Sequence, residues 1–493
     1  MWIFRLIRAT WCLGIIFWSY IFQGMLRRMF PRSERIKARW DKVHAKNALR
    51  AYKTCVKLRG IYIKLGQVLS VMGTFLPQHY VKALEQLQDA VPPRSYREIR
   101  RALKKRLGAP PEEVFATFDE APVAAASLGQ VHKAVTHQGE KVAVKVLYPH
   151  VRTIMKVDMR VLRLAAAVYK RFFVKLEQLD RVLDQLQEML ERETNLEHEA
   201  KCIFRMNENF ASDPDVVLPR VLEELSNKSV LTMTFMDGVK ISNTDALAEL
   251  GLEPLAVATK LVQSFYKSLF IDRFFHADPH PGNFFVQRGD KGQVKLVILD
   301  LGSASEIAPN LADGLGDVIR GFMTKDDKAL MQGVELMGFV AENGDRALLE
   351  RVIRHYFRQI LSLDINDFGN VDEELSAKVH EPDLDKAEVR ALMRSVAYPL
   401  GWFYVERAAL ILFGLSSQLA PNLNIVQTGF PYVARYFAER AMRQAKAAAA
   451  ARAAVPAAGD AAGAPPPAPP VPTVGSGVGG TSELISQQLA IAK

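Results

Sequence analysis

Hydrophobic and polar positions change their spacing several times along the 493 residues of this chain. An uncharged run occupies residues 9–26, and helical periodicity follows over about residues 34–72. Leucines three or four positions apart predict one long helix over residues 177–210, and the chain after Gly302 is again helical to about Ala445. The segments between these helices alternate or are short and apolar, which predicts strands. The pattern therefore predicts an α+β protein.

The strand-like segments lie in the middle of the chain. A small-residue stretch over residues 123–132 precedes a Gln138-Gly139 turn and the apolar run 142–147, which predicts a tight loop and a hairpin. Another strand begins at Val230 and ends at Asp237-Gly238, and a third covers residues 294–299. These segments predict a sheet between two helical regions.

The uncharged run at residues 9–26 just reaches the length of a membrane-spanning helix, roughly 20 residues. Trp2, Trp11 and Trp18 suit a membrane interface, whereas Thr10 and Gln23 weaken the case for a span. No small-residue cleavage site follows, which argues against a removed signal peptide. We expect a membrane anchor that spans the bilayer or lies flat on it, with a buried helix as the plainer alternative.

Charge is unevenly distributed. The net charge is +10, yet residues 1–64 alone contain 15 Lys and Arg and only 2 Asp and Glu. A basic segment beside an apolar one should attract anionic lipid headgroups, and it should keep the body of the protein on the cytoplasmic side. No nucleic-acid-binding module is recognisable, so we expect no nucleic-acid partner. Three widely separated cysteines indicate a reducing compartment and no disulfide framework.

The stretch His276-Ala-Asp-Pro-His-Pro-Gly-Asn283 carries the most specific chemistry. Its prolines and glycine exclude a regular helix, so it forms a loop with a carboxylate, Asp278, five residues before an amide, Asn283. The catalytic loop of protein kinases has the same spacing, with an Asp that positions the acceptor hydroxyl and an Asn that holds Mg²⁺. Asp300, at the end of a predicted strand, fits the second metal ligand. The plainer alternative is a proline-rich surface turn.

Two lysines and two glutamates complete the candidate site. Lys145 closes a Val-Ala-Val-Lys strand, the position from which a kinase lysine reaches the nucleotide phosphates. Lys64 and Gln67 share one face of an apolar helix, where a lysine either extends to solvent or pairs with a carboxylate. Glu193 and Glu199 border the apolar stripe of the long helix and need cationic partners there. For each lysine and glutamate a solvated surface position is the alternative.

In this order the motifs resemble those of the UbiB-like (ADCK-type) atypical kinase family over about residues 37–440. The resemblance implies a bilobal protein-kinase-like α+β fold with a mostly α-helical C-lobe. We expect a membrane-anchor helix over residues 1–30, a basic helical extension over 31–120, an N-lobe over 121–240, a C-lobe over 241–445 and a disordered Ala/Pro-rich tail over 446–493.

The resemblance also implies roles for individual residues. Asp278, Lys145 and Glu199 would be catalytic, with Lys145 paired to Glu199, and Asn283 and Asp300 would bind Mg²⁺. Lys64, held near Glu193, and Gln67 would cover the active site against protein substrates. ATP would be bound by Lys145, by the backbone after the last N-lobe strand and by the alanine-rich loop, that is by Phe235, Met236, Ala124, Ala125, Ala126, Ser127, Gly129 and Gln130.

Two positions depart from the family pattern. The Glu-x-Asp motif reads Glu193-Thr-Asn195, so one carboxylate near the nucleotide or its metal is neutral. The Asp-Phe-Gly motif reads Asp300-Leu-Gly302, which keeps the metal ligand.

The sequence and this resemblance therefore predict a membrane-associated Mg-ATP-dependent kinase or ATPase. The resemblance further implies that it supports ubiquinone or other isoprenoid-lipid metabolism, with other enzymes of isoprenoid-lipid biosynthesis as partners. One rival is a small-molecule phosphotransferase of the aminoglycoside- or choline-kinase type, against which the Lys64–Gln67 helix and the alanine-rich loop count. The other is a weakly catalytic nucleotide-binding scaffold of a lipid-biosynthesis complex, which Asn195 favours.

Overall fold

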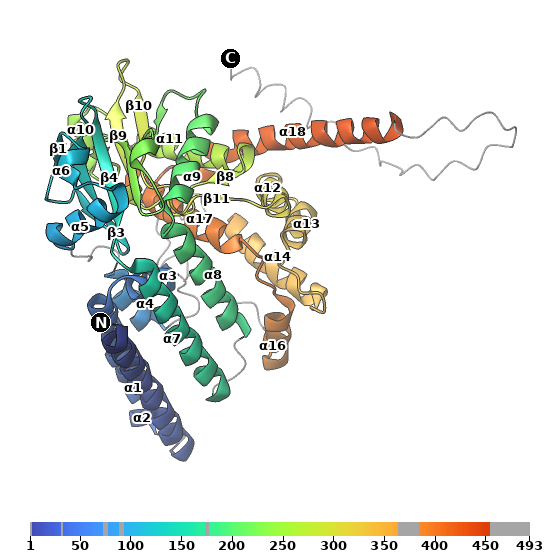
Figure 1. The fold of residues 1–493 in the computed structure, drawn as a ribbon. Coiled ribbons are helices and arrows are strands. Elements are labelled where there is room, and N and C mark those ends of the chain that lie inside the picture. The colour runs from blue at the N-terminus through green and yellow to red at the C-terminus, as the bar shows by residue number, and fades with distance from the viewer. Residues whose placement is uncertain are drawn as a thin grey trace, which may run out of the picture. The chain divides into compact units, whose positions relative to one another are not determined.

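The computed structural model describes residues 2–30, 33–71, 77–87, 93–172, 177–362 and 384–453 (Figure 1). Residues 1–439 form one compact unit and residues 440–493 a second. The helices are α1 (Trp2–Met29), α2 (Glu34–Leu58), α3 (Ile61–Val71), α4 (Gln78–Glu85), α5 (Tyr96–Leu107), α6 (Pro111–Val114), α7 (Val151–Phe172), α8 (Glu177–Glu193), α9 (Leu196–Asn209), α10 (Thr244–Glu249), α11 (Pro254–Tyr266), α12 (Pro309–Thr324), α13 (Asp327–Met337), α14 (Arg346–Ser362), α16 (Lys386–Ser395), α17 (Trp402–Leu419) and α18 (Ile425–Ala453).

The strands in the described residues form three sheets, which confirms an α+β fold. The first has the order β1-β3-β4-β6 with β2 on β3, the second the order β5-β10-β9-β7, and the third pairs β11 with β8. Their bounds are β1 (Thr117–Phe118), β2 (Ala124–Ala125), β3 (Gly129–Val135), β4 (Lys141–Leu147), β5 (Val216–Val217), β6 (Val230–Thr234), β7 (Val239–Lys240), β8 (Phe274–Phe275), β9 (Phe284–Arg288), β10 (Val294–Ile298) and β11 (Ser305–Glu306).

The first sheet is the core of the N-lobe. β4 lies between β3 and β6, and Lys145 faces Val131 on one side and Leu231 on the other. Residues 142, 144 and 146 of β4 are buried against Ile99 and Leu103 of α5 and Phe115. Because β1 also joins this sheet, the N-lobe begins with α5 rather than at residue 121, the boundary that the sequence predicts. The i, i+4 spacing of Ile99 and Leu103 is the physical reason, since it forms an apolar face that the sheet covers.

The long helix predicted over residues 177–210 is two helices, α8 and α9. Thr194 Oγ1 donates a hydrogen bond to the carbonyl of Leu190 in the preceding turn. Asn195 then has extended torsion angles, with φ −120° and ψ 90°, and α9 begins after it. The Thr194 hydroxyl competes for a backbone carbonyl where the leucine repeat breaks, and periodicity alone does not register such a break.

The second sheet and the loop between β8 and β9 position the two predicted metal ligands. β9 and β10 pair in an antiparallel ladder, and the short β8 precedes them. The intervening loop includes a single 3₁₀ turn at Pro281–Asn283. Asn283 therefore lies at the start of β9, and Asp300 follows the end of β10.

The N-terminal helices pack against one another and against the N-lobe. α1 packs against α2 and α7, and α2 packs against α3 and α4 (Figure 1). Arg59 and Gly60 both have positive φ angles, 56° and 58°, and this turn separates α2 from α3. The helical region predicted over residues 34–72 is therefore two helices, and Met72 lies outside the described residues.

The C-terminal region is helical, as the pattern predicts. α17 packs against α11, and α18 continues to Ala453. The sequence places residues 446–453 in a disordered tail, and this is wrong for the described part of the tail. Alanine has the highest helix propensity of all residues, so the alanine run after Lys446 extends the helix. Residues 454–493 of the predicted tail lie outside the described residues.

Candidate active site

Lys145 is the centre of a three-residue charge cluster. Its ammonium nitrogen lies 2.7 Å and 2.9 Å from the two carboxylate oxygens of Glu199 and 2.8 Å from Asp300 Oδ2. β4 supplies the lysine, α9 supplies Glu199, and Asp300 comes from the segment after β10. The predicted pairing of Lys145 with Glu199 is present, and the same lysine also holds Asp300.

The cluster contains one cation and two carboxylates. Burial raises the pKa of Glu199 to about 7, against the opposing effect of Lys145. Burial also tends to raise the pKa of Asp300, but the positive charge of Lys145 outweighs burial and lowers the pKa of this carboxyl. Both carboxylates together raise the pKa of Lys145 despite its burial. Lys145 therefore stays charged, and Asp300 is the carboxylate that stays ionised beside it.

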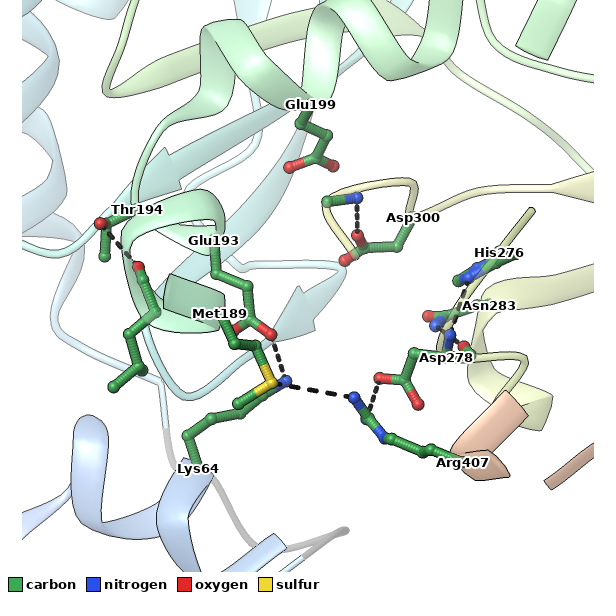
Figure 2. A network of polar contacts seen from close by, with 12 residues as sticks. Lys64, Met189, Glu193, Thr194, Glu199, His276, Asp278, Asn283, Asp300 and Arg407 are labelled. Carbon is green, nitrogen blue, oxygen red and sulfur yellow. Dashed lines mark hydrogen bonds and ion pairs between the residues drawn. The ribbon is translucent and has the colours of Figure 1, made fainter. Parts of the chain in front are cut away.

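Asp300 is also the accessible member of the cluster. Its side chain is 43% exposed, whereas that of Glu199 is 2% exposed. Asp300 Oδ1 accepts a hydrogen bond of 3.0 Å from the backbone of Gly302. A side chain at Gly302 would place its Cβ 3.2 Å from both Asp300 Oδ1 and Glu199 Oε2. The glycine thus leaves room for the two carboxylates to lie close together (Figure 2).

The loop that contains Asp278 is fixed by its own side chains. The Asp278 N–H donates to His276 Nδ1 at 3.2 Å, and Asn283 Nδ2 donates to the Asp278 carbonyl at 3.0 Å. These two bonds hold the backbone of residue 278 from both sides (Figure 2). Since the amide nitrogen of Asn283 is engaged, its amide oxygen is the atom that can bind a cation.

Arg407 pairs with the carboxylate of Asp278. Its Nη2 lies 2.7 Å from Asp278 Oδ2, and both side chains are largely buried. Burial favours the neutral form of Asp278, but Arg407 and then Lys64 outweigh it and hold the pKa of this carboxyl below its usual value. Arg407 is not among the site residues predicted from the sequence. The available signal is that a cation on a buried helix face needs a carboxylate partner.

Lys64 forms the expected contact with Glu193. The Lys64 ammonium lies 2.5 Å from Glu193 Oε1, and both side chains are mostly buried. The contact joins α3 to the end of α8, beside Arg407 and Asp278 (Figure 2). The side chain of Gln67, the partner that the sequence predicts on the same helix face, lies outside the described residues.

The alanine-rich loop combines exposed small residues with a buried support. Ala124 and Ala126 are exposed and Ala125 is partly exposed, whereas Ser127 is buried. A side chain at Gly129 would place its Cβ 2.6 Å from the carbonyl of Val146, so the close pairing of β3 and β4 requires glycine there. Gln130 is 1% exposed and bonds to the backbone of Arg94 and to His132. In this structure the Gln130 side chain supports the loop from behind, and its role in nucleotide binding stays a prediction.

The segment after β6 has the expected position for a hinge. The Phe235 N–H donates to the Lys141 carbonyl at 2.9 Å, which continues the pairing with β4. Phe235 and Met236 are both partly exposed, and β7 then joins the second sheet. These two residues therefore connect the sheets of the two lobes.

The available donors fit Mg²⁺ bound together with a phosphate ligand. The exposed Asp300 carboxylate and the Asn283 amide oxygen are hard oxygen ligands, and Mg²⁺ in nucleotide sites uses one or two carboxylates plus phosphates and waters. No group of three or more His, Cys, Asp or Glu side chains in the described part of the chain could hold a metal alone.

Asn195 stands where the family pattern has a carboxylate. It precedes α9, and its side chain makes no capping hydrogen bond. Its Oδ1 atom is buried, without a hydrogen-bond partner among the described residues. Along the sequence, an uncharged residue therefore lies between Glu193, which pairs with Lys64, and Glu199, which pairs with Lys145.

Comparisons with known proteins agree with this arrangement. Residues 86–334 match the ABC1 atypical kinase-like domain. A probable protein kinase UbiB from Shewanella pealeana is 30% identical over 396 residues, which cover 79% of this chain and 70% of the relative. The Arabidopsis thaliana protein ACTIVITY OF BC1 COMPLEX KINASE 7, chloroplastic, is 30% identical over 430 residues, which cover 84% of this chain and 59% of the relative.

Among solved structures, the complex structure of Rv3197-erythromycin from Mycobacterium tuberculosis aligns with a TM-score of 0.47 at 24% identity. The alignment covers 78% of this chain and 95% of that one.

Proposed function

Because the chain belongs to the ABC1 atypical kinase-like family, we propose that it binds Mg-ATP between its lobes and acts on the γ-phosphate. The observation that carries this proposal is the contact of Lys145 with both Glu199 and Asp300. The exposed Asp300 carboxylate lies beside this lysine, and the Leu299 N–H next to Asp300 donates to the backbone carbonyl of Asn283. Mg²⁺ bound by the Asp300 carboxylate and the Asn283 amide oxygen would neutralise charge on the phosphates.

The surroundings of Asp278 favour hydrolysis or transfer to a small or lipid-related acceptor over protein phosphorylation. Arg407 engages one carboxylate oxygen, and the Lys64–Glu193 pair lies beside it. A carboxylate whose pKa is held low is a weak proton acceptor. Phosphoryl transfer depends more on positioning than on a strong base, so Asp278 can still orient water or a hydroxyl. The covered site restricts the size of the acceptor that reaches it.

A steady-state assay separates these activities. Purified full-length protein should hydrolyse ATP slowly in the presence of Mg²⁺, and it should not phosphorylate a generic protein substrate. Rapid turnover of one soluble amino alcohol or aminoglycoside would instead support the small-molecule kinase alternative, which the family assignment does not favour.

The scaffold alternative is supported by two observations, Asn195 in place of a carboxylate and Arg407 on the catalytic aspartate. A deletion strain complemented with Asp278→Asn decides between the scaffold and the catalytic function. Full complementation by this variant would establish the scaffold, and loss of complementation supports catalysis. Measurement of isoprenoid quinones in the same strains tests the proposed support of ubiquinone or other isoprenoid-lipid metabolism.

We also propose that α1 attaches the protein to a membrane while lying in the plane of one leaflet. By length and composition, residues 4–29 could cross a bilayer. α1 packs against α2, which contains charged residues along its whole length. A spanning α1 would carry these charges into the hydrocarbon or lose its packing, and either is costly.

The exposed face of α1 fits an interfacial position. Its large exposed side chains recur every three, four or seven positions and so form one apolar stripe along the helix. They are Phe4, Ile7, Trp11, Trp18, Phe22, Met25 and Met29. The basic residues of α1 and α2 can contact anionic headgroups beside the stripe. Because basic flanking residues favour the cytoplasmic side of a membrane, we propose that the catalytic body is cytoplasmic.

A further inference from the structure

A small cavity lies behind the alanine-rich loop. It is lined by side chains from segments far apart in the sequence, among them Arg5, Arg59, Arg94, Ser127 and Tyr148. Arg5 comes from α1, Arg59 from the turn between α2 and α3, and Arg94 from the segment before α5. The water-accessible volume of the cavity is about 30 Å³, which corresponds to roughly two or three water molecules or one phosphate group.

Among the described residues, the charges around the cavity leave one arginine without a carboxylate partner. Arg5 pairs with Asp158 at 2.5 Å, and Arg94 pairs with Glu98 at 3.3 Å while it also lies over the ring of Tyr148. Arg59 is exposed, and within the described part of the chain no carboxylate lies at ion-pair distance from it. Three guanidinium groups therefore face two carboxylates, and the surplus charge is positive.

Two donors on the lining residues have no hydrogen-bond partner among the described residues. They are Arg5 Nε and the hydroxyl of Tyr148, and both atoms are buried. Burying a donor without a partner costs about 1–3 kcal/mol, so such atoms usually have an unrecorded ligand or water. Ser127 adds a further hydroxyl at the edge of the alanine-rich loop. N–H and O–H donors on the lining residues, together with the surplus positive charge, favour an anion over a cation.

We propose that this cavity binds a phosphate group, either free in solution or as part of an anionic lipid headgroup. The arginine-rich lining favours phosphate, because guanidinium groups donate to several oxygens of one tetrahedral anion. A carboxylate has only two oxygens and would leave part of this donor set unmatched.

An anion in the cavity also connects three functional elements. It would contact α1, the turn that begins α3, and Ser127 with Leu128 at the base of the alanine-rich loop. α3 carries Lys64, and the alanine-rich loop is part of the proposed nucleotide site. Occupancy therefore changes nucleotide affinity by fixing this loop, and reciprocity requires nucleotide to change the affinity for the anion. This coupling rests on the proposed nucleotide binding, whereas anion binding itself does not.

Direct titration tests the site. Inorganic phosphate is added to full-length protein in chloride buffer, and bound phosphate is measured by calorimetry and by the shift in unfolding temperature. The double variant Arg59→Gln/Tyr148→Phe should lose both signals, and Tyr148→Phe alone should weaken binding by about ten-fold without destabilising the fold. Arg101→Gln, which removes an exposed arginine of α5 that does not line the cavity, should bind like wild type.

Phosphate binding that survives in a folded double variant would place the anion elsewhere and overturn the proposal, as would no binding to wild type. Nucleotide affinity is measured separately without phosphate. Wild type that binds nucleotide but no phosphate contradicts only the anion site, whereas the reverse result contradicts only the proposed function.

Vesicles distinguish the two sources of phosphate. With phosphatidylglycerol vesicles and no free phosphate, a headgroup source predicts at least a five-fold increase in nucleotide affinity for wild type and Arg101→Gln but not for the double variant. Phosphatidylcholine vesicles are the neutral-surface control. If only inorganic phosphate produces the increase, the source is the free anion. No change in nucleotide affinity with either ligand would overturn the coupling.

Discussion

At Asp278 the backbone and the side chain have different partners. His276 and Asn283 hold its backbone, and Arg407 holds its carboxylate. Because Asp278 donates its N–H to His276 Nδ1, the imidazole must be neutral with its proton on Nε2. The buried Nε2 has no hydrogen-bond partner among the described residues, and burial lowers the pKa of His276 to about 4.

The pKa of His276 predicts an acid-dependent loss of stability. Its ordinary value is 6.5, and a lowered pKa in the folded state contributes stability that is present above 6.5 and lost as the pH falls toward 4. The loss amounts to about 3 kcal/mol. Denaturant unfolding of wild type between pH 7 and pH 4 should show this loss in the free energy of unfolding. The variant His276→Asn keeps a hydrogen-bond acceptor but does not titrate in this range, so it should lack this contribution. Parallel pH dependence of both proteins would contradict the prediction.

Arg407 should act as a positioning residue for Asp278. In Arg407→Gln the pKa of Asp278 should rise, because burial is then opposed chiefly by Lys64. The acidic limb of the profile of kcat against pH for ATP hydrolysis should therefore move to higher pH. Arg407→Lys should largely restore the wild-type profile, since it keeps the charge. A lower kcat with an unmoved pH profile would indicate a merely structural role.

At the scale of elements, the Lys64–Glu193 pair connects the N-terminal helices to the N-lobe. Both side chains are mostly buried, so removing one partner leaves a buried charge. A double-mutant cycle with Lys64→Met and Glu193→Gln should give a coupling energy of at least about 1 kcal/mol in unfolding experiments. The exposed pair Arg163 and Asp184 provides the comparison, with an expected coupling below about 1 kcal/mol. Equal coupling for both pairs would mean that the Lys64–Glu193 contact does not fix α3.

The sequence predicts these elements better than their boundaries. The strand of Lys145, the loop of Asp278 and Asn283 and the strand before Asp300 follow from turn residues and alternation, which are local signals. The break after Thr194 coincides with a bond from its hydroxyl to the Leu190 carbonyl and with extended torsion angles at Asn195, which periodicity does not detect. Arg407 enters the site through tertiary packing of α17, about 130 residues after Asp278 along the chain, and no local pattern encodes that proximity.

For the molecule as a whole, the position of α1 decides how the catalytic body meets a membrane. The triple variant Trp11→Ser/Trp18→Ser/Phe22→Ser should lose binding to phosphatidylglycerol vesicles in flotation assays and remain folded, because these side chains are exposed. Met393→Ser/Leu400→Ser, which removes exposed apolar side chains of the C-lobe, should bind vesicles like wild type.

The same vesicles distinguish a helix in the membrane plane from a spanning one. Cysteines introduced at Arg8 and Arg28, exposed positions towards the two ends of α1 that lie outside the apolar stripe, should both react with a membrane-impermeant maleimide added outside. The three native cysteines are buried, and their labelling is measured in parent protein. Reaction of only one end would show that α1 crosses the bilayer, and it would contradict the proposed orientation.

Mg-dependent nucleotide binding tests the central claim most directly. ATP affinity is measured by calorimetry with Mg²⁺ and with a chelator, for wild type, for Asp300→Asn and for Asp290→Asn, a control at an exposed turn. Wild type and Asp290→Asn should bind at least about ten-fold more tightly with Mg²⁺, and Asp300→Asn should lose this gain because its metal ligand is neutral. Absence of Mg-dependent binding in wild type, or an undiminished Mg²⁺ effect in Asp300→Asn, would contradict it.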